Sequence, residues 1–370
     1  MRIPPFKLER YFAEHEFRVR YLLSASDCEA LSLAEVLDMA DPEAAALWRD
    51  LSLGYTESQG RPLLCGEVAR LYTGISPDET LIGAPEELIF VAMNVLLAPG
   101  DHAIVIHPGY QSLSEVAAAS GAEVARWELT LGANGWQLDL GLLERSITPR
   151  TRLLVINFPH NPTGYLPTRA ELDAIIDVAR RHNLHLFSDE MYRLLEYDAG
   201  RRLPSVADLY EHGIALSGLS KAFALPGLRI GWLATHDRAF LVGAAGFKDY
   251  TTICNSAPSE ILGIIALRGR DRILARNRAI IRSNLTQAEA FFAAHRPRFR
   301  WLAPQAGSVA FPQLNDAVPV ADFCQEVLDR RSLMIVPGDV FDYLGNHFRV
   351  GLGRRNFGEA LGVLGEAVRG

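Results

Sequence analysis

Short apolar segments alternate with longer amphipathic segments between about residues 80 and 265. The apolar segments lack the polar alternation of a strand with one wet face, which indicates strands covered by helices on both sides. The amphipathic segments have helical periodicity. Repeated strand–helix units predict an α/β fold with a mostly parallel sheet. The expected strands are His102–Ile106, Glu123–Leu129, Arg152–Asn157, Leu184–Asp189, Ile214–Ser217 and Arg229–Ala234. The expected helices are Leu88–Leu97, Gln111–Ser120 and Thr168–His182.

The C-terminal part of the chain has a different pattern, which predicts a smaller α+β unit. A long helix is expected at Asp271–Ala294, and shorter helices at 320–330 and 356–368. Between them, strands are expected at Ser308–Pro312, Leu333–Val336 and Phe348–Gly351. The first 45 residues contain no sheet pattern, so we expect an arm with short helices that packs on the C-terminal unit. This division predicts a large domain at 46–265 and a small discontinuous domain at 1–45 and 266–370.

Composition narrows the class of protein. The 370 residues are 49% hydrophobic and 22% charged, with a net charge of 37 − 44 = −7, which argues against a dedicated nucleic-acid binder. No run of 18 apolar residues occurs, and the N-terminus lacks the pattern of a signal peptide. Four scattered cysteines without a CxxC pair indicate a cytoplasmic protein without disulfides. His182 and His185 have no metal-ligand companions in the sequence, so no metal is expected.

Candidate chemistry begins where one predicted strand ends, at Ser217-Gly218-Leu219-Ser220-Lys221. A lysine among small and apolar neighbours is a candidate for a lowered pKa and for Schiff-base formation. Arg229, eight residues later, has the planar fork of donors that suits a phosphate. Taken alone, a lysine in such a loop is more often a solvated surface residue.

Two further strands end in polar residues. Asn161 lies in the turn Pro159-His160-Asn161-Pro162-Thr163-Gly164, and the next strand ends in Asp189-Glu190-Met191-Tyr192. Ligands of α/β sheets bind at the carboxyl ends of the strands, so both segments are candidate site elements. A plain tight turn and a helix N-cap are the structural alternatives.

The three segments together resemble the fold-type-I pyridoxal-phosphate enzymes of the class I/II aminotransferase family. The resemblance rests on Asn-Pro-Thr-Gly, Asp-Glu-x-Tyr and Ser-Lys with Pro-Gly-Leu-Arg-x-Gly, with 28 residues from Asn161 to Asp189 and 32 from Asp189 to Lys221. It extends from about Leu53 to the C-terminus. It implies a seven-stranded, mostly parallel sheet in the large domain, and pyridoxal 5'-phosphate as cofactor.

The resemblance also implies roles. Lys221 would form the Schiff base and then move a proton from the substrate α-carbon. Asp189 would keep the pyridine nitrogen protonated. Asn161 and Tyr192 would donate hydrogen bonds to the ring 3' oxygen, and Arg229 would bind the phosphate.

Outside these motifs, Tyr110 follows a Pro-Gly turn and matches the aromatic residue that stacks on the cofactor ring. Arg349 matches the arginine that binds the substrate α-carboxylate, where Asn161 also contributes. Tyr55 matches a tyrosine that reaches the phosphate of a neighbouring subunit. The loop 248–256 resembles one that lines the partner's pocket, so a homodimer with shared active sites is expected.

The phosphate cradle departs from the family pattern. The backbone N–H groups at the start of the helix after Gly83 are expected to meet the phosphate, with Ala84 and Pro85 as the contact positions. Pro85 has no N–H to donate and stands where the family usually has a hydrogen-bonding residue. Gly218 replaces a residue that carries a hydroxyl in many relatives, and Ser217 and Ser220 are candidates to compensate.

Fold does not choose the reaction. The resemblance favours transamination between an amino acid and a 2-oxo acid. The arm Leu8–Glu14 and the segment Ala306–Pro312 resemble instead the capreomycidine-synthase-like branch, which catalyses elimination and cyclisation on an arginine derivative. A third hypothesis is a regulatory effector module with an aminotransferase-like domain. No helix–turn–helix pattern precedes Tyr55, which speaks against this class.

Overall fold

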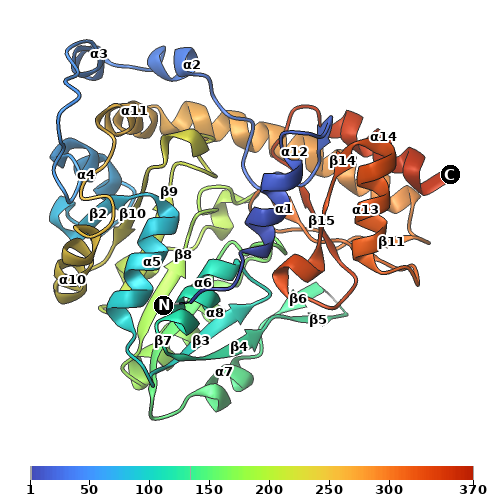
Figure 1. The fold of residues 1–370 in the computed structure, drawn as a ribbon, viewed down its shortest axis with the longest axis horizontal. Helices are drawn as coiled ribbons and strands as arrows, with labels where there is room; N and C mark the ends of the chain where they lie inside the picture. The colour runs from blue at the N-terminus through green and yellow to red at the C-terminus, as the bar shows by residue number, and fades with distance from the viewer. Residues whose placement is uncertain (1, 134, 370) are drawn as a thin grey trace.

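A seven-stranded sheet forms the centre of the computed structural model, which describes residues 2–133 and 135–369 (Figure 1). Its strand order is β2-β10-β9-β8-β7-β3-β4. Strand β10 runs antiparallel to both neighbours, and the other pairs are parallel, so the predicted mostly parallel sheet is confirmed. The strands are β2 (Thr80–Gly83), β3 (His102–His107), β4 (Glu123–Glu128), β7 (Thr151–Asn157), β8 (His185–Asp189), β9 (Gly213–Gly218) and β10 (Gly231–Ala234).

Helices cover both faces of this sheet, which explains why its strands are apolar at nearly every position. Successive residues of β3 alternate between two cores: Ile104 and Ile106 pack with one, Ala103 and Val105 with the other. The second core contains residues of α5 (Pro85–Leu96), α6 (Gln111–Ala119) and α10 (Arg238–Lys248). The first contains residues of α4 (Pro62–Ala69), α7 (Leu140–Ser146), α8 (Arg169–Arg181), α9 (Val206–Leu209) and α11 (Ala257–Arg268).

The parallel strands bring the polar ends of several segments to one edge of the sheet. Strands β7 and β8 end in register at Asn157 and Asp189. The Asn157 side chain donates to the Asp189 carbonyl oxygen (2.9 Å) and accepts from the backbone N–H of Asn161 (2.8 Å). Through these two hydrogen bonds, the Asn157 side chain holds the Asn161 turn against the ends of β7 and β8.

The C-terminal unit is built around a small sheet and the long helix α12 (Arg270–Ala294), which crosses the top of Figure 1. Its three-stranded sheet has the order β12-β16-β15, and β11 pairs with β13. Its elements are β11 (Phe299–Arg300), β12 (Val309–Ala310), β13 (Gln313–Leu314), α13 (Val320–Arg331), β14 (Leu333–Met334), β15 (Val336–Pro337), β16 (Phe348–Gly351) and α14 (Phe357–Arg369).

The N-terminal arm contains a strand that the sequence pattern did not predict. Strand β1 (Tyr21–Leu22) pairs in parallel with β14, which corrects the expectation that the first 45 residues hold no sheet element. Two residues are too few to show a strand period, which is why the pattern is silent there. The expected strand at 333–336 is also divided: β14 pairs with β1, whereas β15 pairs with β16.

Helix α1 (Lys7–His15) packs on the C-terminal unit, as expected, but it also touches the large sheet unit. Leu8 is buried with Met334 and Val336, and the Tyr11 hydroxyl donates to the Ile335 carbonyl oxygen at 3.0 Å. On the other side, the rings of Phe6 and Tyr110 lie 4.9 Å apart. The arm therefore bridges the two parts of the molecule. The remaining elements before β2 are α2 (Leu33–Leu37), α3 (Pro42–Arg49) and a short 3-10 helix, Pro77–Glu79.

Other differences from the expected elements are local. Strand β2 and the hairpin β5 (Thr130–Gly132) with β6 (Gly135–Gln137) were not predicted. Strand β10 begins at Gly231 rather than Arg229, because Arg229 has a left-handed backbone (φ 54°) that no strand accommodates. The expected large-domain limit at residue 265 lies inside α11, and we propose Gly269, between α11 and α12, as the boundary. Among the described residues, no helix is long and apolar enough to cross a membrane.

Candidate active site

A cavity of about 630 Å³ lies at the carboxyl edge of the sheet, between the large sheet unit, the N-terminal arm and the C-terminal unit. It brings together side chains from positions as far apart in the chain as Phe6 and Arg349. Nine residues singled out from the sequence line it: Pro85, Tyr110, Asn161, Asp189, Tyr192, Ser220, Lys221, Arg229 and Arg349.

Lys221 stands in the turn that follows β9. Its Nζ donates a hydrogen bond to Ser26 Oγ at 2.8 Å, which joins the lysine to the N-terminal arm. The Ser220 hydroxyl beside it is buried and has no partner among the described residues. An unsatisfied buried hydroxyl is costly, so this atom is free to bind a polar ligand group.

Asp189 is 6% exposed at the end of β8. Burial raises the pKa of its carboxyl to about 7, against the opposing effects of the Met191 N–H and of the positive charge on Lys221. The Met191 N–H donates to Asp189 Oδ1 at 3.1 Å. A cation placed beside this carboxyl would favour its ionised form. The Tyr192 hydroxyl, three residues later and also buried, has no partner among the described residues.

Arg349 lies on β16 and is only 1% exposed. Its Nη1 donates to Asn161 Oδ1 (3.3 Å) and its Nη2 to the Ser24 carbonyl oxygen (3.0 Å), while Nε has no partner among the described residues. Burial lowers the pKa of this guanidinium. A buried guanidinium without a carboxylate partner is costly, and an anion that binds in the cavity would relieve that cost.

The start of α5 and Arg229 form another part of the cavity wall. Pro85 occupies the first position of α5, where a missing N–H does no harm to the helix. Its ring fills the space that side chains would otherwise take: Pro85 Cγ lies 3.2 Å from the place of a Cβ at Gly218 and 2.8 Å from that of a Cβ at Gly231. With Pro85 in this place, position 218 has little room for a side chain, which explains why a glycine stands there instead of a hydroxyl residue. The two departures from the family pattern belong together.

Three sequence-predicted residues do not line this cavity. Ala84 caps α5, and its N–H points to Glu87 Oε2 at 3.4 Å. Ser217 Oγ donates to the Glu190 carbonyl oxygen at 3.5 Å. Tyr55 is 92% exposed beside a separate cavity of about 450 Å³. In the single chain, none of the three faces Lys221.

The N-terminal arm supplies cavity residues that sequence analysis did not assign. They are Phe6, Leu8, Glu9, Arg10, Phe12, Glu16, Ser26 and Asp27. The spacing of Glu9, Phe12 and Glu16 places them on one helical face. This spacing is visible in the sequence, but the sequence does not show which part of the molecule that face contacts. Glu86, at the start of α5, is a further cavity residue that sequence analysis did not assign. Its carboxyl lines the cavity as well, and burial raises its pKa.

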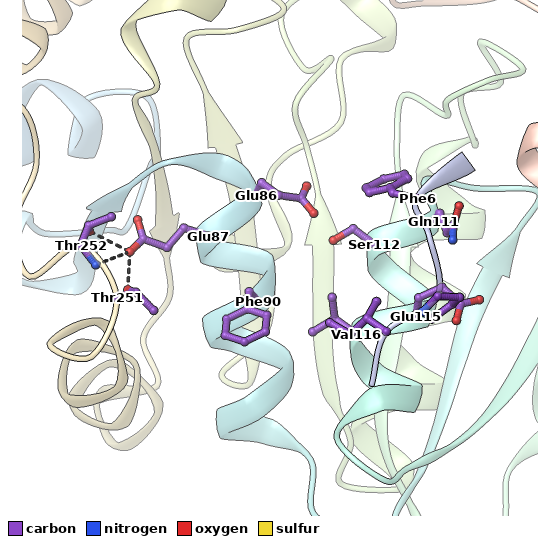
Figure 2. A pocket seen from close by; sticks show the side chains of 12 residues that line it. Phe6, Glu86, Glu87, Phe90, Gln111, Ser112, Glu115, Val116, Thr251 and Thr252 are labelled. Atoms are coloured by element: carbon purple, nitrogen blue, oxygen red, sulfur yellow. Dashed lines mark hydrogen bonds between the residues drawn. The ribbon is translucent and has the colours of Figure 1, made fainter. Parts of the chain in front are cut away.

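A second cavity of about 430 Å³ adjoins the first and shares Phe6 and Glu86 with it (Figure 2). Figure 2 shows Glu86 pointing across the space between α5 and α6 toward Ser112. The next residue, Glu87, points the other way and accepts hydrogen bonds from Thr251 and from Thr252 Oγ1 (2.7 Å). These contacts attach the loop that follows α10 to the start of α5.

At the opposite edge of the sheet, His185, His212 and Asp237 lie together, with ligand atoms within 4.8 Å of one another. Asp237 Oδ2 lies 3.2 Å from both His185 Nε2 and His212 Nδ1. Sequence analysis found no companions for His185, because His212 and Asp237 are far from it along the chain. The two imidazoles and the carboxylate satisfy one another by hydrogen bonds.

The large cavity fits pyridoxal phosphate chemically. It offers an amine at Lys221, a buried carboxyl at Asp189 for a protonated ring nitrogen, and a guanidinium at Arg229 for a phosphate. The Tyr192 and Ser220 hydroxyls are donors without acceptors among the described residues. These residue types together define a pyridoxal-phosphate enzyme of the aminotransferase fold.

Comparison with known proteins supports the same class of enzyme. The profile of the family "Aminotransferase class I and II" matches residues 23–356, so the chain belongs to that family and is a pyridoxal-phosphate-dependent enzyme of the aminotransferase type. Over 345 residues it is 28% identical to "Capreomycidine synthase" of Streptomyces vinaceus, which covers 92% of this chain and 87% of that protein. Over 301 residues it is 30% identical to "Probable aspartate/prephenate aminotransferase" of Thermus aquaticus, covering 80% and 77%.

Among solved structures, the chain is similar to a PLP-dependent aminotransferase from Streptococcus suis. The TM-score is 0.93 and the sequence identity 30%, with 100% of this chain and 98% of that chain covered. The similarity over the whole length includes the N-terminal arm and the C-terminal unit.

Proposed function

We propose that this enzyme transfers an amino group between an amino acid and a 2-oxo acid in the cavity around Lys221. Bound pyridoxal phosphate would supply an electron sink that makes the bonds to the substrate α-carbon labile. The observation that carries the proposal is the buried Arg349, with an unpartnered Nε, in the same cavity as Lys221 and Asp189. Arg349 offers a site for a carboxylate, Lys221 offers an amine that can transfer a proton, and Asp189 offers a partner for a protonated ring nitrogen.

Each residue would then have a limited task. Arg349 binds the substrate α-carboxylate, and Asn161 orients Arg349 by accepting from its Nη1. Lys221 holds the cofactor and moves the proton at the α-carbon. Asp189 stays ionised against the ring nitrogen, and Tyr192 and Asn161 donate to the ring oxygen. Tyr110 covers the ring, and Arg229 with Ser220 binds the phosphate.

An amino-donor screen on the cofactor-loaded enzyme tests this function. We expect at least one amino acid to shift the cofactor absorbance to that of its amine form, and a 2-oxo acid such as 2-oxoglutarate or pyruvate to restore it. Lys221→Ala should lose this exchange by about a thousandfold or more, since proton transfer by a positioned group contributes 10²–10⁴-fold and cofactor attachment is lost as well. A Lys221→Ala protein that kept its activity would refute the assignment.

The second candidate is a cyclase or lyase of the capreomycidine-synthase-like type. It is favoured by the length of the match to capreomycidine synthase, 92% of this chain. Both reactions begin with loss of the α-proton, so both use Lys221, Asp189 and Arg349 in the same way. They differ in the product: if amino acids are consumed without formation of the amine form of the cofactor, and mass spectrometry finds a cyclised or deaminated product, the second candidate holds.

We further propose that the enzyme acts as a homodimer in the cytoplasm. The exposed Leu53, Tyr55, Tyr250 and Ile253 support an interface, since isolated chains rarely leave several large apolar side chains bare on neighbouring segments. The free cysteines Cys28, Cys65, Cys254 and Cys324 fit a reducing compartment.

A further inference from the structure

The wall of the cavity that faces the substrate is acidic. Three carboxylates from the N-terminal arm line it, namely those of Glu9, Glu16 and Asp27. Three cations of the cavity have other tasks in the proposed function: Lys221 and Arg229 serve the cofactor, and Arg349 serves the substrate α-carboxylate. Arg10 lines the cavity as well and has no task in that function. The carboxylates of the arm therefore face the part of the substrate that is left, its side chain.

Two of these carboxylates already have partners. Asp27 forms a two-pronged ion pair with Arg354, in which Nη2 lies 3.0 and 3.1 Å from the two carboxylate oxygens. Glu9 accepts a hydrogen bond from the Tyr110 hydroxyl at 3.0 Å. Glu16 accepts no hydrogen bond and joins no ion pair within the described part of the chain. Of the three arm carboxylates, Glu16 is therefore the one whose oxygens are free to bind a ligand.

The surroundings of Glu16 disfavour a negative charge. Burial raises the pKa of its carboxyl, and the charges of Asp27 and Glu9 raise it further, while the positive charges of Arg354 and Lys221 act the other way. Glu16 also caps the C-terminal end of α1, where the helix dipole opposes a carboxylate. Arg354 and Lys221 therefore compensate the charge of Glu16 only in part, and a cation that binds beside it would compensate the rest.

The geometry of α1 gives the distance to be spanned. Phe12 lies on Arg349, with its ring centre 5.7 Å from the guanidinium carbon. Glu16 is one helical turn further along the same face, about 6 Å away along the axis. A substrate with its α-carboxylate on Arg349 would reach Glu16 with a long, unbranched side chain. Arg10 also lines the cavity, but it lies 100° around the helix from Glu9, away from this face.

We propose that Glu16, supported by Glu9 and Asp27, makes the enzyme selective for amino acids whose long side chain ends in a positive charge. The proposal rests on the proposed function, since it places the α-carboxylate on Arg349. A second feature also indicates a ligand here: the Nε of Arg349, itself 1% exposed, is unpartnered in the same cavity. The side-chain cation would be a guanidinium or an ammonium group, both of which satisfy a carboxylate.

Titration of the cofactor-loaded enzyme tests this selectivity. L-Arginine and L-lysine are compared with their uncharged counterparts of similar shape, L-citrulline and L-norleucine, and with L-glutamate. Binding is followed both by cofactor absorbance and by calorimetry. We expect the cationic amino acids to bind about ten- to a hundredfold more tightly than their neutral counterparts, the range of a charge-assisted hydrogen bond. The comparison of arginine with lysine shows whether the site prefers a planar guanidinium or a compact ammonium group.

Glu16→Gln should reduce this preference to about threefold or less, while leaving the affinity for citrulline unchanged. Glu14→Gln is the matched control, because Glu14 is on the same helix and its side chain is 69% exposed. Glu9→Gln, which keeps an acceptor for Tyr110, should have an intermediate effect. Equal binding of arginine and citrulline by the wild type, tighter binding of glutamate, or equal behaviour of the Glu16 and Glu14 variants would each overturn the proposal.

The two proposals fail differently. If arginine binds by calorimetry and loses affinity in Glu16→Gln, but no amino acid converts the cofactor to its amine form, transamination is wrong and the selectivity stands. If neutral amino acids convert the cofactor as well as cationic ones do, transamination stands and the selectivity is wrong.

Discussion

The buried environment of Asp189 disfavours its negative charge in the cofactor-free protein. In the folded chain Asp189 keeps its proton up to about pH 7, whereas its ordinary pKa is 3.8. A raised carboxyl pKa means that the folded state binds more protons than the unfolded state between these values. Stability of the cofactor-free protein therefore falls as pH rises from about 4 to about 7.

Asp189→Asn should remove this pH dependence. We expect the cofactor-free variant to gain stability over the wild type as pH rises from about 4 to about 7, with a plateau above, by up to about 4 kcal/mol. Urea unfolding at pH 5 and pH 8 measures it. Asp177→Asn, at a site with 72% side-chain exposure, is the control and should show no such gain. Adding pyridoxal phosphate should stabilise the wild type more than Asp189→Asn. The reverse order would contradict the role of Asp189.

Single site residues can be predicted from the sequence where a polar or charged residue directly follows an apolar strand. Lys221, Asp189 and Asn161 each follow an apolar strand, so parallel pairing alone brings them to one edge. Glu16 and Ser26 could not be found in this way. They reach the cavity through the direction of a short helix and a loop, and both depend on packing against the C-terminal unit.

At the scale of elements, the junction of α5, β9 and β10 is tightly constrained. A Cβ on Gly231 would lie 2.7 Å from the Ser217 carbonyl oxygen and 2.8 Å from Pro85 Cγ. The first of these atoms is backbone and cannot rotate away. The phosphate side of the cavity therefore depends on two glycines and a proline acting together.

Gly231→Ala should destabilise the protein by about 1–3 kcal/mol, because the added methyl group forces β9 and β10 apart. It should also weaken cofactor binding, since α5 and the Arg229 turn would shift. Gly227→Ala is the matched control: nothing lies within 4 Å of its added Cβ, and its effect should stay within about 0.5 kcal/mol. Thermal unfolding with and without cofactor measures both. Equal melting temperatures for the two variants would contradict this account.

Element prediction succeeds where apolar runs are long and fails where they are short. Strands β3, β4, β7, β8 and β9 and the helices α6 and α8 follow the pattern within about two residues, because burial on two faces leaves a strong signal. Strand β2 has four residues and β1 has two, and each is fixed by its partner rather than by its own period. The break at Ile335, which divides β14 from β15, is equally invisible in an apolar run.

At the scale of the whole molecule, Tyr55 is the residue that the single chain leaves without a role. It is 92% exposed and does not line the cavity that contains Lys221. Tyr250, on the loop that was expected to line a partner's pocket, is equally exposed. A dimer that joins these segments to a second cavity would complete the phosphate site with a group from the other subunit.

Mixing two inactive variants tests this arrangement. Lys221→Ala and Tyr55→Ala subunits, combined and allowed to exchange, should regain about one quarter of the wild-type activity, because half of the dimers are mixed and each contains one intact site. If Tyr55 served its own subunit, mixing would restore full sites in no dimer and activity would not recover. Light scattering of the mixture verifies that dimers form.

The stretch from Ser24 to Asp27 touches both ends of the cavity. The Ser24 carbonyl oxygen holds Arg349, the Ser26 hydroxyl holds Lys221, and the Asp27 carboxylate is fixed by Arg354. None of these three arm residues belongs to the sheet edge that supplies Asn161 and Asp189. A substitution in this N-terminal stretch therefore changes how Arg349 and Lys221 are held, without touching the strand ends that carry Asn161 and Asp189.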